Sequence, residues 1–272
     1  MVRVLIKIIF SDMDGTLLDD NSRLPAGFDE MMSELKTRGV IFAPASGRQY
    51  FSLLRSFGKY TDEFLFVAEN GTLVMHNRRE IFSKAMKQSE VLEILSTKFD
   101  ADDVFRVYCG KKNAYFLEEQ LKPENLAELE KYFTQNITVK TFDDVDDAPL
   151  KMSFFDANAT VAETVYPILK EKFGRDLQVV LSSDYWVDVM APGINKGVAI
   201  ENVQRLLKIK REECAAFGDY LNDAEMMKAV GHGFAMANAH PDLKKLTRYE
   251  TLSNNEAGVL VGIRRLIDEG LL

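Results

Sequence analysis

Two acidic side chains, Asp12 and Asp14, stand two residues apart directly after an apolar run at residues 5–10. The run predicts a buried strand with apolar side chains on both faces, as in a parallel sheet. Carboxylates just past such a strand lie where open α/β sheets place their chemistry. There a carboxylate can hold a magnesium ion, attack an electrophile or exchange a proton. By themselves the two residues fit a solvated acidic turn closed by Gly15 equally well, so the interpretation depends on the rest of the chain.

Polar side chains also follow three later apolar runs that predict buried strands. Lys196, in addition, opens a predicted helix whose first turn points at the same edge. The carboxyl ends of parallel strands meet at one edge of a sheet, so we expect all these groups to converge on Asp12 and Asp14. The side chains that follow the later runs are Ser46, Asn70 and Asp219.

Strand and helix patterns alternate at both ends of the chain but not in its middle. The first part predicts β-α-β-α-β and then a hairpin, and the last part alternates again from a helix at residues 196–207 onward. Between them, adjacent short strands mix with helices, which is typical of an α+β unit. We therefore predict an α/β fold with a doubly wound, Rossmann-like parallel sheet. Its discontinuous core comprises residues 1–82 and 187–272, and an α+β cap is inserted at residues 83–186.

Composition and charge limit the classes of partner. The chain has 272 residues, of which 46% are hydrophobic and 28% charged, as in a soluble globular protein. Its net charge of −8 disfavours nucleic acid, because binding to a phosphate backbone needs clustered lysine and arginine. No apolar stretch is long enough to span a bilayer and no signal peptide is evident, so we expect a cytoplasmic protein that binds no membrane.

The cysteines and histidines do not indicate a metal centre of their own. Cys109 and Cys214 both lie in apolar segments, which fits a reducing compartment and makes a disulfide between them unexpected. The three histidines are scattered among turn-like residues, so we expect no histidine metal site. The acidic stretch 143–147 lacks the glycine and terminal glutamate of a calcium loop and predicts a solvated turn.

With these motifs, the chain resembles the Cof-type phosphatases of the haloacid dehalogenase superfamily, the branch with a large cap inserted between its second and third motifs. The resemblance extends over essentially the whole chain, because the motifs occur in the expected order and spacing. Within that branch the chain is similar to bacterial sugar-phosphate phosphatases. The matching segments are Asp12–Thr16, Ser46–Arg48, Glu69–Gly71, Asn195–Gly197 and Gly218–Asp223.

The resemblance implies a phosphatase that forms an aspartyl-phosphate. Asp12 would attack the phosphorus in line, and Asp14 would protonate the leaving alkoxide and later activate water. Lys196 would offset the charge of Asp12 and of the transferring phosphoryl group. Its alternative role is that of a solvated lysine, but the helix dipole disfavours a cation at a helix start unless an anion holds it there.

The phosphate-binding and metal-binding residues follow from the same resemblance. The phosphate would be held by Ser46, the N–H of Gly47 and Asn222, and with less support by Asn70; Ser46 could instead cap a helix, and Asn70 could simply form a turn. The metal is expected to be Mg²⁺, held only by oxygen ligands. Its ligands would be Asp12, the backbone carbonyl of Asp14 and Asp219, with Asp223 as their support through water or through Lys196.

Cap residues are harder to assign from sequence. Trp186 could stack on a sugar, but a strand aromatic is the favoured interpretation, and Lys151 could meet a second anion but is expected to be solvated. We assign no catalytic role to Arg48, and we expect Thr16 to be a structural hydroxyl that bonds the loop.

Other functions fit parts of the pattern. A phosphotransferase or mutase on the same scaffold would return the phosphoryl group to a second hydroxyl, and a non-catalytic phosphometabolite-binding protein would lack Asp12 or Asp14, both of which are present. A receiver domain also pairs carboxylates with a lysine, but the chain is too long and carries the insert. The expected partner is a small phosphorylated molecule, and the expected assembly is a monomer or weak homo-oligomer; the physiological substrate is left open.

Overall fold

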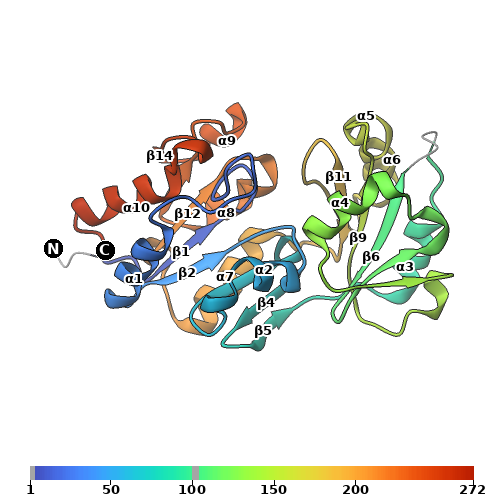
Figure 1. Ribbon diagram of the computed structural model, residues 1–272, viewed down its shortest axis with the longest axis horizontal. Helices are drawn as coiled ribbons and strands as arrows, with labels where there is room; N and C mark the ends of the chain where they lie inside the picture. The colour runs from blue at the N-terminus through green and yellow to red at the C-terminus, as the bar shows by residue number, and fades with distance from the viewer. Residues whose placement is uncertain (1–3, 100–103) are drawn as a thin grey trace.

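The computed structural model describes residues 4–99 and 104–272 and consists of two lobes (Figure 1). Segments from both ends of the sequence, coloured blue and orange to red, interleave in one lobe, the core. The middle of the chain, coloured green to yellow, forms the other lobe, the cap. The core lobe is therefore discontinuous in sequence.

A parallel sheet of five strands forms the centre of the core, in the order β14-β13-β12-β1-β2. In the middle strand, β1, Phe10 lies opposite Ala43 on one side and Ala216 on the other. All four residues of β1 are buried, because helices cover both faces of the sheet. The strands are β1 (Ile8–Ser11), β2 (Ile41–Pro44), β12 (Cys214–Gly218), β13 (His232–Ala235) and β14 (Tyr249–Glu250).

A sixth strand, β3 (Leu65–Ala68), continues this sheet beyond β2. Ala45 and Val67 form a parallel bridge, and the N–H of Ser46 donates to the carbonyl of Val67 over 2.9 Å. The predicted hairpin follows as β4 (Leu73–His76), which pairs antiparallel with β3, and β5 (Arg79–Ser83), which pairs antiparallel with β4.

The core sheet is covered on both faces. Gly262 of α10 packs against Phe217 and Phe234, whereas Met227 of α8 packs against Gly233. Neighbouring residues of a strand point to opposite faces, so α8 and α10 lie on opposite sides of the sheet, as a doubly wound fold requires. The core helices are α1 (Phe28–Thr37), α2 (Tyr50–Ser56), α7 (Lys196–Leu207), α8 (Ala224–Ala229), α9 (Pro241–Lys244) and α10 (Gly258–Asp268).

The cap is built on a second sheet, in the order β10-β11-β9-β6-β7-β8. All its pairings are antiparallel except β7 with β8. Its strands are β6 (Phe105–Gly110), β7 (Ala114–Leu117), β8 (Asn136–Val139), β9 (Pro149–Phe155), β10 (Gln178–Leu181) and β11 (Trp186–Met190). Its helices are α3 (Gln88–Leu95), α4 (Pro123–Tyr132), α5 (Val161–Thr164) and α6 (Tyr166–Phe173).

The cap contacts the core through the end of α4. The last carbonyls of an α-helix have no partner within the helix. Here the carbonyls of residues 130–132 accept from Arg55 Nη2, Ser52 Oγ and the Gln49 N–H over 3.0, 2.9 and 3.3 Å, respectively. Three donors from core helix α2 and its N-cap, Gln49, thus complete a helix of the cap.

Strand pairing refines two of the predicted boundaries. The expected junction between residues 186 and 187 falls inside β11, all of which pairs with β9. Pairing therefore favours a junction after Met190, and the division into domains remains a prediction. The expected first strand also starts later, at Ile8, because Leu5 is exposed rather than buried.

One predicted helix is two helices in the structure. The pattern of Val161, Val165 and Leu169 predicts a continuous helix, but the structure has α5 and α6 with a break at Val165. Pro167 explains the break, since proline lacks an N–H and its ring clashes with the carbonyl four residues earlier. The short elements α9 and β14 were not predicted, because four and two residues carry too little periodicity.

Other expectations can be compared directly. Cys109 and Cys214 are buried and unpaired, as expected. Most of the acidic stretch 143–147 is solvated, but Asp147 accepts from the backbone N–H groups of Lys112 and Asn113 and so organises the turn before β7. Within residues 4–99 and 104–272, none of the helices combines the length and apolar character that crossing a bilayer demands.

Gly71 lies where the loop after β3 packs closely against the start of α7, and a substitution there tests this packing. Gly71 has a φ of +98°, and an added Cβ would lie 2.5 Å from the carbonyl oxygen of Asn195, just before α7. We expect Gly71→Ala to lower the free energy of unfolding by about 2 kcal/mol or more in urea titrations. Gly39→Ala is the control: its φ is +72° but nothing lies within 4 Å, so only backbone strain of about 1 kcal/mol should remain. Equal losses in the two variants would contradict the steric explanation.

Candidate active site

A buried lysine joins two carboxylates at the carboxyl edge of the core sheet. Lys196, the first residue of α7, donates to Asp12 Oδ1 over 2.5 Å and to Asp223 Oδ1 over 2.6 Å. Two carboxylates thus hold this lysine at the helix start, where at least one anion was expected. Its side chain is only 1% exposed, so the alternative of a solvated lysine is wrong. Burial by itself would lower the pKa of Lys196, but Asp12 and Asp223 outweigh that effect and raise it.

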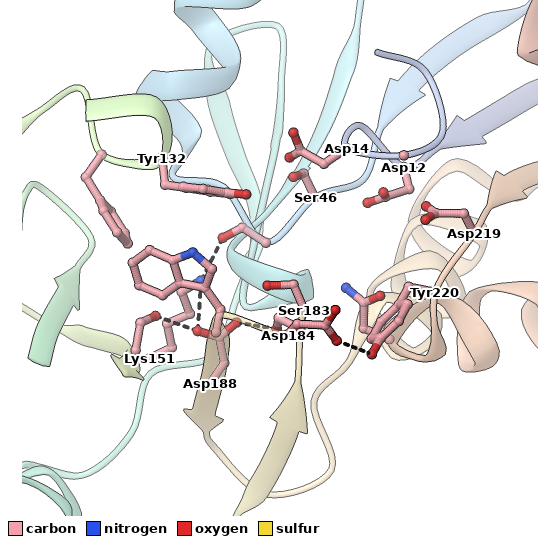
Figure 2. A pocket seen from close by; sticks show the side chains of 17 residues that line it. Asp12, Asp14, Ser46, Tyr132, Lys151, Ser183, Asp184, Asp188, Asp219 and Tyr220 are labelled. Atoms are coloured by element: carbon pink, nitrogen blue, oxygen red, sulfur yellow. Dashed lines mark hydrogen bonds and ion pairs between the residues drawn. The ribbon is translucent and has the colours of Figure 1, made fainter. Parts of the chain in front are cut away.

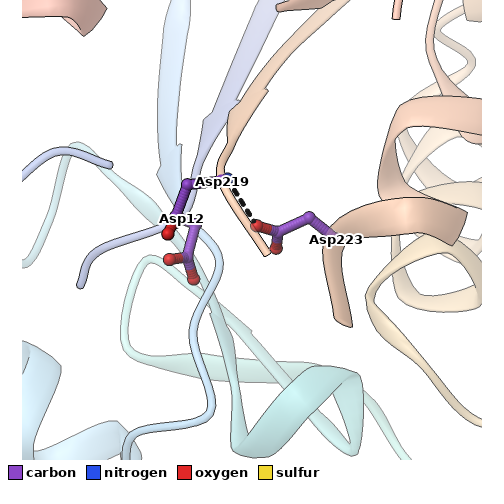
Figure 3. A group of neighbouring side chains, drawn as sticks. All are labelled: Asp12, Asp219 and Asp223. Carbon is purple, nitrogen blue, oxygen red and sulfur yellow. Dashed lines mark hydrogen bonds between the residues drawn. The ribbon is translucent and has the colours of Figure 1, made fainter. Parts of the chain in front are cut away.

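Asp219 lies beside this pair, at the end of β12. Its Oδ1 accepts from the hydroxyl of Thr16 over 2.7 Å, which gives Thr16 the structural role expected of it. Asp223 supports the same loop, because its Oδ2 accepts from the backbone N–H of Asp219 over 3.0 Å (Figure 3). The two strand ends that carry Asp12 and Asp219 are thereby fixed against each other.

Three carboxylates form the one cluster of potential metal ligands that the described part of the chain contains: Asp12, Asp219 and Asp223. Their ligand atoms all lie within 4.8 Å of one another. Lys196 supplies one positive charge against three carboxylates, so the cluster has an excess of negative charge and oxygen donors that suit Mg²⁺. The residues present therefore fit the expected ion, and Asp223 lies beside the two predicted ligands Asp12 and Asp219.

Burial is the main influence on the pKa of two carboxyl groups in this cluster. Burial raises the pKa of Asp12 well above its ordinary value, despite the attraction of Lys196. Burial, and then repulsion from Asp223, raises the pKa of Asp219 to about 7, despite the hydrogen bond from Thr16. A bound divalent cation would reverse this balance and favour the ionised forms.

Asp14 points away from the other carboxylates and pairs with Arg48. Arg48 Nε and Nη2 donate to Asp14 Oδ2 and Oδ1 over 2.8 and 2.5 Å, a bidentate pair. The Asp14 side chain is therefore not in the metal cluster, and its backbone carbonyl remains only a predicted ligand. Two cap residues complete this corner: Lys131 Nζ lies 3.9 Å from Asp14 Oδ1, and the guanidinium of Arg48 lies 5.2 Å from the ring centre of Tyr132.

Ser46 and Gly47 form a tight turn after β2. The Ser46 Oγ accepts from the N–H of Arg48 over 3.1 Å, so Ser46 shapes the turn. The alternative expectation, that Ser46 caps the next helix, is wrong, because the N-cap of α2 is Gln49. Binding of phosphate by Ser46 and Gly47 stays a prediction.

Asn70 lies between this turn and the cap. Its φ is +54° and its side chain is buried. The amide Nδ2 donates to Asp188 Oδ2 over 2.5 Å and to Ser182 Oγ over 3.0 Å, while Oδ1 accepts from Asn222 Nδ2 over 3.4 Å. Asn70 therefore connects the cap with the loop of Asn222, a role that sequence did not indicate.

The site opens into a cavity of about 290 Å³ between core and cap. In Figure 2, Asp12, Asp14 and Ser46 from the core lie across this hollow from Lys151 and Asp188 of the cap. Aromatic side chains of the cap form one wall, and serines and acidic residues form another. The aromatic residues are Tyr132, Phe133 and Trp186, and the polar ones include Ser182, Ser183 and Asp184.

Lys151 differs from its expected surroundings, whereas Trp186 does not. Lys151 is 2% exposed, so the expectation that it is solvated is wrong; its strand, β9, is buried along its whole length. Trp186 packs in the cap against Phe133 and Phe155, as the favoured interpretation has it, and also lines the cavity. Sequence reasoning missed the pairing of Arg48 with Asp14. The signal that could have indicated it is the position of Arg48 directly after Ser46 and Gly47, in the same matching segment.

Comparisons with known proteins agree with the geometry. A family model described as haloacid dehalogenase-like hydrolase matches residues 9–263. The 5-amino-6-(5-phospho-D-ribitylamino)uracil phosphatase YbjI of Escherichia coli (strain K12) is 30% identical over 264 residues, which cover 96% of each chain.

Solved structures share the fold. The crystal structure of SMU.1108c from Streptococcus mutans UA159 has a TM-score of 0.87 at 23% identity and covers 97% of this chain and 99% of that chain. A structure described as the HAD subclass IIB sugar phosphatase BT4131 has a TM-score of 0.79 at 21% identity and covers 98% and 100%, respectively.

The raised pKa of Asp219 predicts an unusual pH dependence of stability. An acid with a higher pKa in the folded chain destabilises the fold as pH rises from its ordinary pKa of 3.8 to its folded pKa of about 7. In EDTA, Asp219→Asn should therefore raise the melting temperature by a few degrees, and the gain should grow as the pH is raised through this range.

Adding Mg²⁺ should reverse the order, because the ion stabilises the unmodified protein more than the variant. Thermal scans at several pH values, with and without Mg²⁺, measure both effects. A difference in melting temperature that is the same at every pH would contradict the assigned titration.

Proposed function

Because this chain belongs to the haloacid dehalogenase-like hydrolases and is a phosphatase, we propose that it hydrolyses phosphate monoesters of small metabolites, sugar phosphates above all, with Mg²⁺ as its cofactor. One observation carries the proposal: Asp12, bound to the buried Lys196, lines a cavity that core and cap enclose together. A carboxylate in this setting is placed to attack a phosphorus atom, and the cavity has room for a leaving group.

Charge is the main obstacle to such a reaction. A phosphate dianion repels a carboxylate nucleophile, and the three clustered carboxylates increase that repulsion. Mg²⁺ held by Asp12, Asp219 and the backbone carbonyl of Asp14 would supply the neutralising charge when bound. Lys196 adds a fixed positive charge beside Asp12, and Asp223 holds Lys196 in place.

The two carboxylates of the first motif would have separate tasks. Asp12 attacks the phosphorus, the bond from phosphorus to the ester oxygen breaks, and an aspartyl-phosphate forms on Asp12. Asp14 gives a proton to the departing oxygen and then takes one from the water that releases phosphate. Since Arg48 holds both oxygens of Asp14, Asp14 has to turn from Arg48 toward the leaving group during the cycle.

The phosphate itself would be held by backbone and side-chain donors of the core. Ser46 and Gly47 line the cavity from the turn after β2, and Asn222 lines it from the loop after β12. Three neutral donors suit a group whose charge is already offset by a metal ion and a lysine. Asn70 would act indirectly, by holding Asn222.

The cavity supports a small substrate. A volume of about 290 Å³ is at the lower end of the usual range for small-molecule sites, and it admits a metabolite but not a folded partner. Its polar wall can bond sugar hydroxyls, and its aromatic wall offers a face for a ring. The similar protein from Escherichia coli is named for a phosphorylated ribityl compound that carries a uracil ring, so this compound belongs among the first candidates.

Phosphate release from a panel of compounds tests the proposal. The panel contains sugar phosphates, nucleotides and 5-amino-6-(5-phospho-D-ribitylamino)uracil, each with Mg²⁺ and with EDTA. We expect release that depends on Mg²⁺, with the highest kcat/KM for a phosphorylated sugar or sugar alcohol. Absence of release with folded, Mg²⁺-bound protein would contradict the proposal, and transfer to a second hydroxyl would identify a phosphotransferase.

Two substitutions test the assigned carboxylates. Asp12→Asn should remove turnover, a loss of at least about 10³-fold in kcat, because an amide is not a nucleophile, and Asp14→Asn should lower kcat strongly as well. Both asparagines keep the shape of the aspartates, so both variants should stay folded. The control is Asp242→Asn, an exposed acid that pairs with Lys245. Retention of full activity in the Asp12 variant would contradict the mechanism.

A further inference from the structure

A second buried lysine lies under the turn of Ser46 and Gly47. Lys151 belongs to β9 of the cap, yet its Nζ donates to the carbonyl oxygen of Gly47 in the core over 2.6 Å. The same nitrogen lies 3.0 Å from Glu69 Oε2 and 3.4 Å from Asp188 Oδ1. One ammonium group therefore contacts the two core segments after β2 and β3, and also the cap strand β11.

The two carboxylates around Lys151 have their partners inside the protein. Asp188 Oδ1 accepts from Ser153 Oγ over 2.5 Å, and Asp188 Oδ2 accepts from Asn70 Nδ2 and Ser182 Oγ over 2.5 and 2.6 Å. Glu69 is 1% exposed and has Lys151 as its ion-pair partner. Asp188 is thus satisfied within the protein, whereas the buried oxygens of Glu69 have no hydrogen-bond partner among the described residues and rely on the ion pair with Lys151.

The Gly47 carbonyl is the informative contact. A hydrogen bond to this oxygen fixes the peptide group that follows Gly47, and so restrains the turn that carries the Ser46 hydroxyl and the Gly47 N–H. The turn is also held from its side, because a Cβ on Gly47 would lie only 3.2 Å from the Asn70 amide. Lys151 and Asn70 are both bonded to Asp188, so a single cap residue links the two restraints.

We propose that Lys151 is a positioning residue of the cap that holds the Ser46–Gly47 turn in its phosphate-binding shape. The inference rests on the proposed function, in which this turn binds the phosphoryl group. The anion site of the core is then complete only when the cap is docked. Lys151 acts on the phosphate of every substrate, whatever the leaving group.

Two roles for Lys151 give different results with small and large substrates. Loss of a residue that contacts the leaving group raises the KM of sugar phosphates. It does not raise the KM of acetyl phosphate, whose leaving group has only a few atoms. Loss of a residue that positions the turn raises the KM of both substrates by similar factors and also weakens the binding of inorganic phosphate. Lys151→Met separates these roles, because it keeps the length of the side chain and removes its charge and donors.

A cap lysine of similar type serves as the control. Lys111 also joins the cap to an acid of the core, with its Nζ 2.9 Å from Glu80 Oε2, but it is only half-buried and does not line the cavity. Lys111→Met should leave phosphate binding unchanged.

The measurements are the Kd of inorganic phosphate with Mg²⁺, by calorimetry, and kcat and KM for acetyl phosphate and ribose 5-phosphate. For Lys151→Met we expect the Kd and both KM values to rise by about tenfold or more, by similar factors, as for the loss of a charged hydrogen bond. An unchanged Kd, or an effect confined to ribose 5-phosphate, would overturn the proposal.

Loss of a buried lysine leaves two acids unpaired and can unfold the chain. The double substitution Lys151→Met with Glu69→Gln removes one of those charges, leaves Asp188 with its three neutral donors, and should show the same rise in Kd. Hydrolysis by the unmodified protein with no change of Kd in either variant would refute this inference alone. Failure of the unmodified protein to bind phosphate would refute the proposed function as well.

Discussion

The structure depends on the balance of charge around one buried ammonium group. Lys196 lies between Asp12 and Asp223, and Asp219 adds a further carboxylate that no lysine contacts. Such a cluster is costly to bury unless each charge has a fixed partner, which is why three strand or helix ends have to meet there. The doubly wound sheet provides that meeting point, because β1 and β12 are neighbours and the first turn of α7 lies against both loops.

The cap repeats this arrangement on its own side of the cavity. Lys151 is as buried as Lys196, and it also lies between two carboxylates. Lys196 is bonded to Asp12, the proposed nucleophile, and Lys151 is bonded to the turn proposed to hold the phosphate. Core and cap are thus connected through ionic groups that water does not reach, and through the carbonyls at the end of α4, which core donors complete. A substrate placed between the lobes meets a site to which both contribute.

Sequence predicted the groups at strand ends well, because each of them follows a short apolar run and carries a motif. Asp12, Asp219 and Lys196 converge as expected. Sequence was a poorer guide to burial where distant segments of the chain cover a residue. Nothing near Lys151 indicates that β9 is covered on both faces, so Lys151 was expected to be solvated. Arg48 was left without a role for the same reason, since its partner Asp14 is 34 residues away. The helix break at Pro167 was local and could have been predicted from the proline alone.

The insertion of the cap between two halves of the core has a consequence for synthesis on the ribosome. The described cap strands all lie between Phe105 and Met190, so they can pair with one another as soon as that segment has emerged. Strand β1 is made first, but one of its edges stays open until Cys214–Gly218 follows, more than two hundred residues later. An open apolar edge invites pairing with other chains. Early compaction of the cap would shorten the effective loop between β1 and β12, and so would help β12 to reach that edge once it has been made.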